Sequence, residues 1–335
     1  MKYAAGGVKR RLARRLLQCA LTLFLVITIN FFLIRMVPGD VLVGILGESE
    51  YTRLQTDFPK VLERVREKYG LNDSLPVQYV RYLRSMLQLD FGYSYANKQP
   101  VTRYVLYHMY WTMILLLPAI LLSALIGGAA GLWAGWKRGG MADRVLTPLC
   151  IVLNNVPANF ISILFLMFFA FRLKWFPLGG MTRGGLSGAA KALDVIRHMV
   201  LPVSILVLFR SCGNFLYMKS YTAQIAGQEF VTTALSKGVP DRRVLRRHIV
   251  KNALPPYLTL LCMQFGHLFS GSMILETVFS WKGMGTLLQT SAKAKDYPVL
   301  QFSILLIAAT VLFFNLLADG LCAWIDPRIR REGCA

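Results

Sequence analysis

The sequence predicts an all-α integral membrane protein with six transmembrane helices. Of its 335 residues, 55% are hydrophobic and 16% are charged, whereas soluble globular domains carry about 25% charged residues. Six apolar segments are each long enough to supply the roughly 20 residues that a helix needs to cross a bilayer. They cover residues 16–36, 106–136, 145–171, 199–218, 254–275 and 298–318. This pattern argues against a soluble enzyme and predicts one transmembrane domain over residues 1–335.

The first apolar segment is expected to persist as a helix rather than to be cleaved as a signal peptide. Lys9, Arg10 and Arg11 precede it, as basic residues precede the apolar part of a signal peptide. Its apolar run is longer than that of a signal peptide, and the sequence RMVPGD that ends it contains no small-residue cleavage site. It therefore counts as the first span.

The loop 38–103 is expected to lie outside the cell and to contain two short amphipathic helices. Leu62 and Val65 recur at helical spacing among charged residues, and Leu83 and Leu87 do so again further along. Two roles fit these helices: a solvated cap with a structural role only, or a lid that contacts a substrate.

The basic residues indicate the orientation of the chain rather than nucleic-acid binding. There are 38 Lys and Arg against 17 Asp and Glu, and a chain this apolar is typical of a membrane protein with cationic loops. With the N-terminus in the cytoplasm, 19 Lys and Arg lie on the cytoplasmic side and 8 in the two short outer loops. The long loop is left out because the positive-inside rule applies to short loops. Both termini are therefore expected in the cytoplasm.

The sequence contains no motif for a metal, a nucleotide or a disulfide framework. Its six cysteines stand singly, and we find neither a zinc-protease motif, nor a serine-hydrolase motif, nor a phosphate-binding loop. We therefore expect no cofactor and no catalytic residue in this chain.

The loop 219–251 is expected to fold as a helix, a glycine turn and a second helix. Glu229 lies in the first turn of the first helix, where the helix dipole favours an anion. Gly238 follows this helix as a left-handed cap. An apolar stripe runs along it through Phe230, Val231, Ala234 and Leu235.

The second helix of this loop is expected to start after Pro240 and to stop before Pro255. It carries the basic residues Arg242, Arg243, Arg246 and Arg247 at helical spacing. Two interpretations fit this amphipathic basic unit: an interfacial pair held by anionic membrane lipid, or a docking element for another protein.

The segment GQEFVTTALSKGVPDRRVLRRHIVKNALPPYLTLL resembles the EAA loop of ABC-transporter permeases of the dipeptide, oligopeptide and nickel importer family. The motif positions are filled by Glu229, Ala234, Gly238, Asn252 and Pro255. Thr232 and Leu235 depart from the motif, because family members commonly have Arg at both positions. The resemblance implies that this loop forms the coupling helices that dock on the ATP-hydrolysing subunit. The surface expected to contact that subunit is the apolar stripe of Phe230, Val231, Ala234 and Leu235.

The resemblance extends over nearly the whole chain and points to the first of the two permease subunits. It includes YGLNDSLPVQYVRYL, DFGYSYANKQPV, WFPLGG, ETVFSWKGMG, DYPVLQ and the terminal DPRIR. It implies a bacterial inner-membrane permease of the type I importer fold, paired with a paralogous permease. Two ATPase subunits that bind ATP and Mg, and an extracytoplasmic solute-binding protein, complete the assembly that it implies.

Arg210 is the one charge inside the six predicted spans apart from their ends. A charge at this depth is costly and should face the bundle interior, a partner helix or water. It is a candidate for the translocation path, where it would suit a carboxylate of the cargo. Equally, it could pair with Glu276 or Asp319, or extend toward the cytoplasm.

Glu276, Trp281, Gly283 and Gly285 are candidates for an outer gate that meets the binding protein. The resemblance of ETVFSWKGMG to a family element supports this role, whereas composition alone favours an interfacial aromatic anchor followed by a helix-ending glycine turn.

Two other classes of function remain as alternatives at this point. An ion-coupled secondary transporter or channel subunit should show inverted repeats and charged or broken helices at the midplane. An intramembrane hydrolase should show nucleophile or metal motifs. The sequence shows neither pattern, and it leaves the cargo open among di- and oligopeptides, glutathione, nickel or metal complexes and some sugars.

Overall fold

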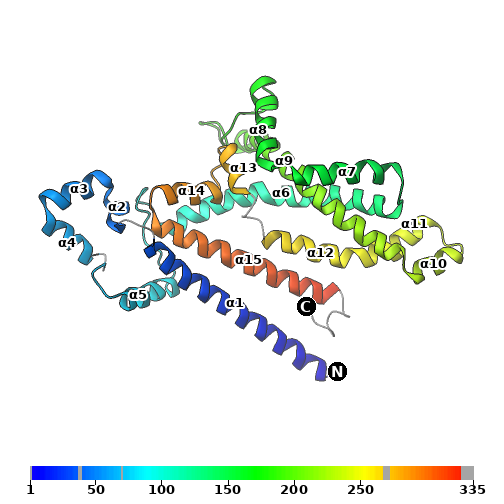
Figure 1. The fold of residues 1–335 in the computed structure, drawn as a ribbon, viewed down its shortest axis with the longest axis horizontal. Coiled ribbons are helices and arrows are strands. Elements are labelled where there is room, and N and C mark those ends of the chain that lie inside the picture. The colour runs from blue at the N-terminus through cyan, green and yellow to red at the C-terminus, as the bar shows by residue number, and fades with distance from the viewer. Residues whose placement is uncertain (1, 37–39, 69–70, 267–271, 326–335) are drawn as a thin grey trace. The chain divides into compact units, whose positions relative to one another are not determined.

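The computed structural model describes residues 2–36, 40–68, 71–266 and 272–325 (Figure 1). Within these ranges the regular structure is helical, apart from an isolated antiparallel bridge between Tyr93 and Pro100. The chain divides into two compact units. The first comprises Met1–Tyr110 with Gly283–Leu312, and the second comprises Trp111–Lys282 with Phe313–Ala335.

Four long helices correspond to four of the six predicted spans. They are α1 (Lys2–Met36), α6 (Val101–Trp136), α9 (Gly188–Ala226) and α15 (Tyr297–Ile325). Each contains a stretch that is long and apolar enough to cross a membrane. In α9 the helix extends well beyond the predicted span 199–218 at both ends.

The prediction of one continuous helix over residues 145–171 is wrong. The structure has α7 (Met141–Asn155), then α8 (Ala158–Phe165) with the π-helical η1 (Leu166–Arg172), and the two parts are bent by 97°. Val156 is extended, with φ −85° and ψ 132°, because the ring of Pro157 disfavours the helical conformation in the residue before it. Pro157 therefore places the bend.

The fifth predicted span, 254–275, falls on two helices. These are α12 (Val250–Gly266) and α13 (Ser272–Val278), and residues 267–271 between them lie outside the described part of the chain. Among the described residues there are thus four helices that are long and apolar enough to cross a membrane, or five if the bent pair counts as one span.

The loop 38–103 contains four helices rather than the two that the sequence predicts. The predicted pair corresponds to α4 (Pro59–Lys68) and α5 (Leu75–Leu87), while α2 (Val41–Leu46) and α3 (Glu48–Asp57) were missed. Leu42, Ile45 and Leu62 form a small core among them. Asp40 explains the start of α2, because its carboxylate accepts a hydrogen bond from the Leu42 amide at 3.0 Å and also pairs with Arg66.

Asp296 connects the end of this loop to the turn between α14 (Met284–Lys293) and α15. It follows α14, and its carboxylate is buried. The carboxylate accepts hydrogen bonds from the Ser94 hydroxyl, from the Tyr95 amide at 3.1 Å and from the Ala96 amide at 3.3 Å. One carboxylate therefore fixes the turn within the sequence DFGYSYANKQPV.

The second unit is built on close packing of α6 against α9. Gly127, Gly131 and Gly135 lie one turn apart along α6 and are buried. A Cβ added at them would stand 2.4 to 2.7 Å from backbone oxygens of α9. Small residues at this spacing let membrane helices approach closely.

Candidate functional site

The loop after α9 folds as two short helical segments joined by a glycine turn, as predicted. The first is α10 (Glu229–Ser236), and the second begins with α11 (Asp241–Val244). Gly238 has φ +75°, the left-handed conformation that glycine adopts without a steric penalty. The Gly238 amide donates to the Leu235 carbonyl at 2.9 Å, and the Val239 amide donates to the Ala234 carbonyl at 3.2 Å. This turn satisfies the carbonyls at the end of α10.

The second helix of the loop does not stop before Pro255, and that prediction is wrong. It runs from α11 through the π-helical η2 (Leu245–Ile249) directly into α12, which contains Pro255 and Pro256. Pro255 and Pro256 have no N–H to donate to the carbonyls one turn before them, yet the helix continues through both. Near them, Asn252 Nδ2 donates to the His248 carbonyl at 2.6 Å, and Thr259 Oγ1 donates to the Pro255 carbonyl at 3.1 Å. Proline is tolerated within membrane helices, so the two prolines do not end this one. The loop 219–251 is therefore continuous with α12.

The apolar stripe of α10 does not form one exposed surface. Val231 and Ala234 are buried inside this chain, where they belong to a cluster with residues of α9, η2 and α12. Phe230 and Leu235 are 41% and 38% exposed. The expectation that all four residues face a partner is thus wrong for Val231 and Ala234, because their surface is already covered.

The base of the loop is fixed by an ion pair that the sequence analysis missed. The Lys219 ammonium in α9 pairs with the Asp143 carboxylate in α7, and it donates to Thr147 Oγ1 at 2.7 Å. Asp143 also accepts from the Gly139 amide at 3.0 Å. The sequence gives little indication of this ion pair, because Asp143 is a lone acid in the basic loop 137–144 and nothing in the sequence places it beside α9.

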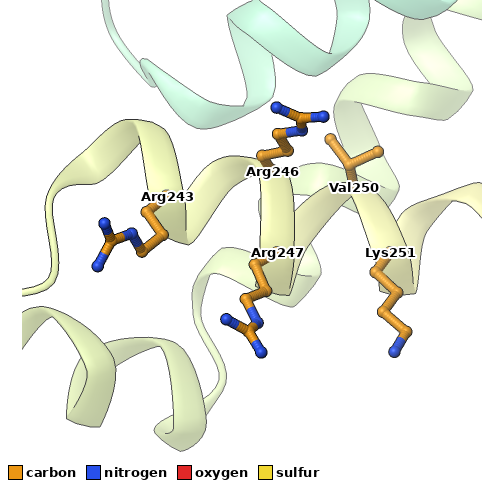
Figure 2. Close-up of a pocket in the computed structure, with 5 residues that line it drawn as sticks. All are labelled: Arg243, Arg246, Arg247, Val250 and Lys251. Atoms are coloured by element: carbon orange, nitrogen blue, oxygen red, sulfur yellow. The ribbon is translucent and has the colours of Figure 1, made fainter.

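Four cations border an open hollow on the second half of the loop. The hollow has a volume of about 560 Å³ and is lined by Arg243, Arg246, Arg247, Val250 and Lys251. Figure 2 shows Arg246 and Val250 on one side of the helical rod and Arg247 and Lys251 on the other. No carboxylate within the described ranges lies at ion-pair distance from these cations.

Arg210 is half-buried in the middle of α9. It forms no ion pair with Glu276, which instead accepts a hydrogen bond from Thr112 Oγ1 at 2.8 Å. The side chain of Asp319, the other expected partner, lies outside the described residues. One turn further along α9, Asn214 Oδ1 accepts from Gln264 Nε2 of α12 at 2.7 Å. Arg210 and Asn214 thus lie on the same face of α9, and Asn214 is hydrogen-bonded there to Gln264 of α12.

Glu276 and Trp281 are fully buried and contact α6. Trp281 Nε1 donates to the Trp111 carbonyl at 3.0 Å, and the two indole rings meet edge to face with centroids 5.8 Å apart. The Trp281 amide donates to the Glu276 carbonyl at 2.7 Å. Glu276 and Trp281 therefore lie in one buried turn. A buried Trp281 does not fit the expectation of an aromatic anchor exposed at the membrane interface.

Gly283 and Gly285 start a helix rather than end one. Gly283 precedes α14 with φ −102°, and Gly285 is buried in its first turn. The left-handed residue of this segment is Ser280, with φ +50°. The expectation of a helix-ending glycine turn at these two positions is thus wrong.

Comparisons with known proteins identify the kind of chain to which these features belong. Residues 127–331 match the family described as binding-protein-dependent transport system inner membrane component. The chain belongs to this family. Residues 8–116 match the N-terminal domain described for the same type of membrane component.

Several curated relatives are similar over nearly their whole length. The oligopeptide transport system permease protein AppB of Bacillus subtilis (strain 168) is 31% identical over 321 residues, which cover 94% of this chain and 98% of the relative. The glutathione transport system permease protein GsiC of Escherichia coli (strain K12) is 30% identical over 317 residues, covering 95% and 97%. A probable peptide ABC transporter permease protein, y4tP of Sinorhizobium fredii, is 30% identical over 317 residues, covering 95% and 98%.

The chain is therefore an inner-membrane permease subunit of an ABC importer and not an enzyme. This result confirms the family inferred from the EAA-like loop and excludes the secondary transporter and the hydrolase. The terminal DPRIR sequence that contributed to the resemblance lies outside the described residues.

Proposed function

We propose that this chain forms one half of the translocation pore for peptides or a similar small solute. A paralogous permease supplies the other half, and two separate ATPase subunits bind ATP and Mg and drive the cycle. An extracytoplasmic solute-binding protein delivers the cargo. The names of the relatives, which include oligopeptide and glutathione permeases, support this class of cargo.

The observation that carries the coupling role is the packing of α10 onto both neighbouring membrane helices. Val231 and Ala234 pack in one buried cluster with Met218 of α9 and with Tyr257 of α12. A displacement of α10 is therefore transmitted to both helices, because packed interiors resist deformation. Phe230 and Leu235 remain exposed on the same short helix, and we assign them, with Glu229, to the surface that contacts the ATPase.

The membrane orientation follows from this assignment. We propose six spans, with the fifth formed by α12 and α13, and both termini in the cytoplasm. The loops 137–144 and 219–251 then lie on the cytoplasmic side, and the loop 38–103 lies outside. The distribution of Lys and Arg supports this arrangement.

We assign Arg210 to the translocation path. It is half-buried and has no carboxylate partner within the described ranges, and the polar pair of Asn214 and Gln264 lies one turn away. A cation beside amide groups suits a cargo that carries a carboxylate. We assign the buried turn of Glu276 and Trp281, with Gly283 and Gly285 after it, to the outer gate.

Reconstitution into vesicles tests this function. We expect uptake of a labelled peptide to require the paralogous permease, the ATPase subunits, the binding protein and ATP. Uptake that is driven by an ion gradient when the ATPase subunits are omitted would contradict the proposal. A variant that cannot hydrolyse ATP, introduced in the ATPase subunits alone, serves as the matched control because it leaves this chain unchanged.

A further inference from the structure

The basic hollow on the coupling loop has the composition of an anion-binding site. Four of its five lining residues are cations, and three of these are arginines. Arg243, Arg247 and Lys251 follow one another at four-residue intervals, so they form a row along one face of the helical rod. Like charges at this spacing repel one another, and no carboxylate of the described chain lies at ion-pair distance from them. An anion from outside the chain would relieve this repulsion.

The hollow lies beside residues that mark a membrane interface. Trp136 and Leu132, at the end of α6, pack against the same cluster that holds η2 and α12 in place. The neighbouring Trp133 is 49% exposed, and the Lys137 ammonium stands 4.5 Å from its ring centroid. Tryptophan and lysine at the end of a transmembrane helix are typical of the headgroup level. In the proposed membrane orientation, this neighbourhood places the cations of the loop near the level of the lipid phosphates.

The surface changes from basic to apolar in the direction of the membrane. Lys251 is exposed, and Leu254, one turn further along α12, is 42% exposed. A phospholipid changes from charged to apolar in the same direction, because its phosphate lies at the interface and its acyl chains lie beneath it. An acidic protein surface would also attract these cations, and the experiment below distinguishes it from a lipid.

We propose that this hollow binds the phosphate headgroup of an anionic phospholipid, with Arg243, Arg247 and Lys251 as the principal contacts. A guanidinium group can donate two parallel hydrogen bonds to the oxygens of one phosphate. Basic pockets beside membrane helices bind the headgroups of anionic lipids. The site rests on the proposed membrane orientation but does not depend on docking of the ATPase. A bound lipid would fix the start of α12, and hence the coupling loop, relative to the bilayer.

The test measures lipid retention by the purified importer complex. The complex is washed with detergent, supplied with equal amounts of phosphatidylglycerol and phosphatidylcholine, and analysed for bound lipid by mass spectrometry. We expect selective retention of phosphatidylglycerol. The combined substitution Arg243→Gln, Arg247→Gln and Lys251→Gln should lower this retention about tenfold or more, because each cation contributes to the attraction.

Arg242→Gln is the matched control, because Arg242 is exposed on the same segment and does not line the hollow. It should leave retention unchanged. Equal retention by the triple variant, or an equal loss in the Arg242 variant, would overturn the site. If the triple variant keeps phosphatidylglycerol but releases the ATPase subunits, the hollow binds an acidic protein surface and the lipid proposal fails. Loss of ATP-driven uptake in the triple variant with lipid retention intact would also overturn the lipid site, while leaving the proposed coupling function standing.

Discussion

Gly131 of α6 lies directly against the backbone of Phe215 in α9, so that a Cβ at position 131 would stand 2.5 Å from the Phe215 carbonyl oxygen. Gly127 and Gly135 meet α9 in the same way one turn before and after. The close approach places Lys219 near Asp143, since α9 also packs on α7. The base of the coupling loop therefore depends on three glycines within the membrane segment.

Gly131→Ala should destabilise the protein by about 1–3 kcal/mol, the usual cost of overpacking. The obstructing atoms are backbone atoms and a Cβ of α9, which cannot move aside without shifting the helix. Gly213→Ala is the control, because an added Cβ there meets nothing within 4 Å. Thermal unfolding of the purified protein measures both variants. If Gly131→Ala and Gly213→Ala unfold at the same midpoint temperature, α6 and α9 are not in close contact.

Asp296→Ala should loosen the turn at Ser94 by about 1–3 kcal/mol, because it leaves the buried Ser94 hydroxyl and two part-buried backbone amides without their acceptor. The stability of the turn in Asp296→Asn should lie between that of Asp296→Ala and that of the parent protein, since asparagine keeps one acceptor oxygen. Limited proteolysis near residues 94–96 reports the change. Asp90→Ala is the control, because Asp90 is exposed and bonds only locally to the Gly92 amide. If cleavage rates are the same for all variants, Asp296 does not hold the turn.

Gly238→Val should lower ATP-driven uptake while the protein still inserts in the membrane. An added Cβ has open space around it, so the expected cost is backbone strain of about 1 kcal/mol or more at φ +75°. Relief of this strain would tilt α10 away from α11. Gly227→Val, in the same loop but at φ −82°, carries no such strain and serves as the control. Full transport and full substrate-stimulated ATPase activity in the Gly238 variant would refute the coupling role of this turn.

Arg210→Ala should lower uptake about tenfold, which corresponds to about 1.4 kcal/mol on the rate-limiting barrier, and should leave the yield of the complex nearly unchanged. Arg197→Ala, an exposed cation near the start of the same helix, should alter neither. Uptake and complex yield are measured in parallel. If the complex fails to assemble while the assembled fraction transports normally, Arg210 is a structural residue.

Local sequence signals predicted the local features of this fold. Hydropathy located the long helices, and the position of Gly238 after an amphipathic run predicted its left-handed turn. Pro157 also carried a local signal, which the apolar length of residues 145–171 concealed. In contrast, Pro255 and Pro256 predicted a helix end, but both lie inside α12, because prolines are tolerated within membrane helices.

Contacts between distant segments could not be predicted. Periodicity showed that α10 has an apolar face, but it could not show that Val231 and Ala234 are covered by α9 and α12 while Phe230 and Leu235 are not. The hydrogen bond between Thr112 and Glu276 and the ion pair between Asp143 and Lys219 likewise depend on how helices pack. One sequence does not fix the rotation of a helix about its axis.

Site-specific crosslinking of α10 to the ATPase subunits tests the coupling role most directly. Single cysteines are placed at Phe230, Val231, Ala234 and Leu235 in a cysteine-free chain, and each is combined with single cysteines across the ATPase surface. Our account predicts crosslinks from positions 230 and 235, which are exposed, and none from positions 231 and 234, which are buried. Absence of any crosslink from 230 and 235, or equal crosslinking from all four positions, would contradict it.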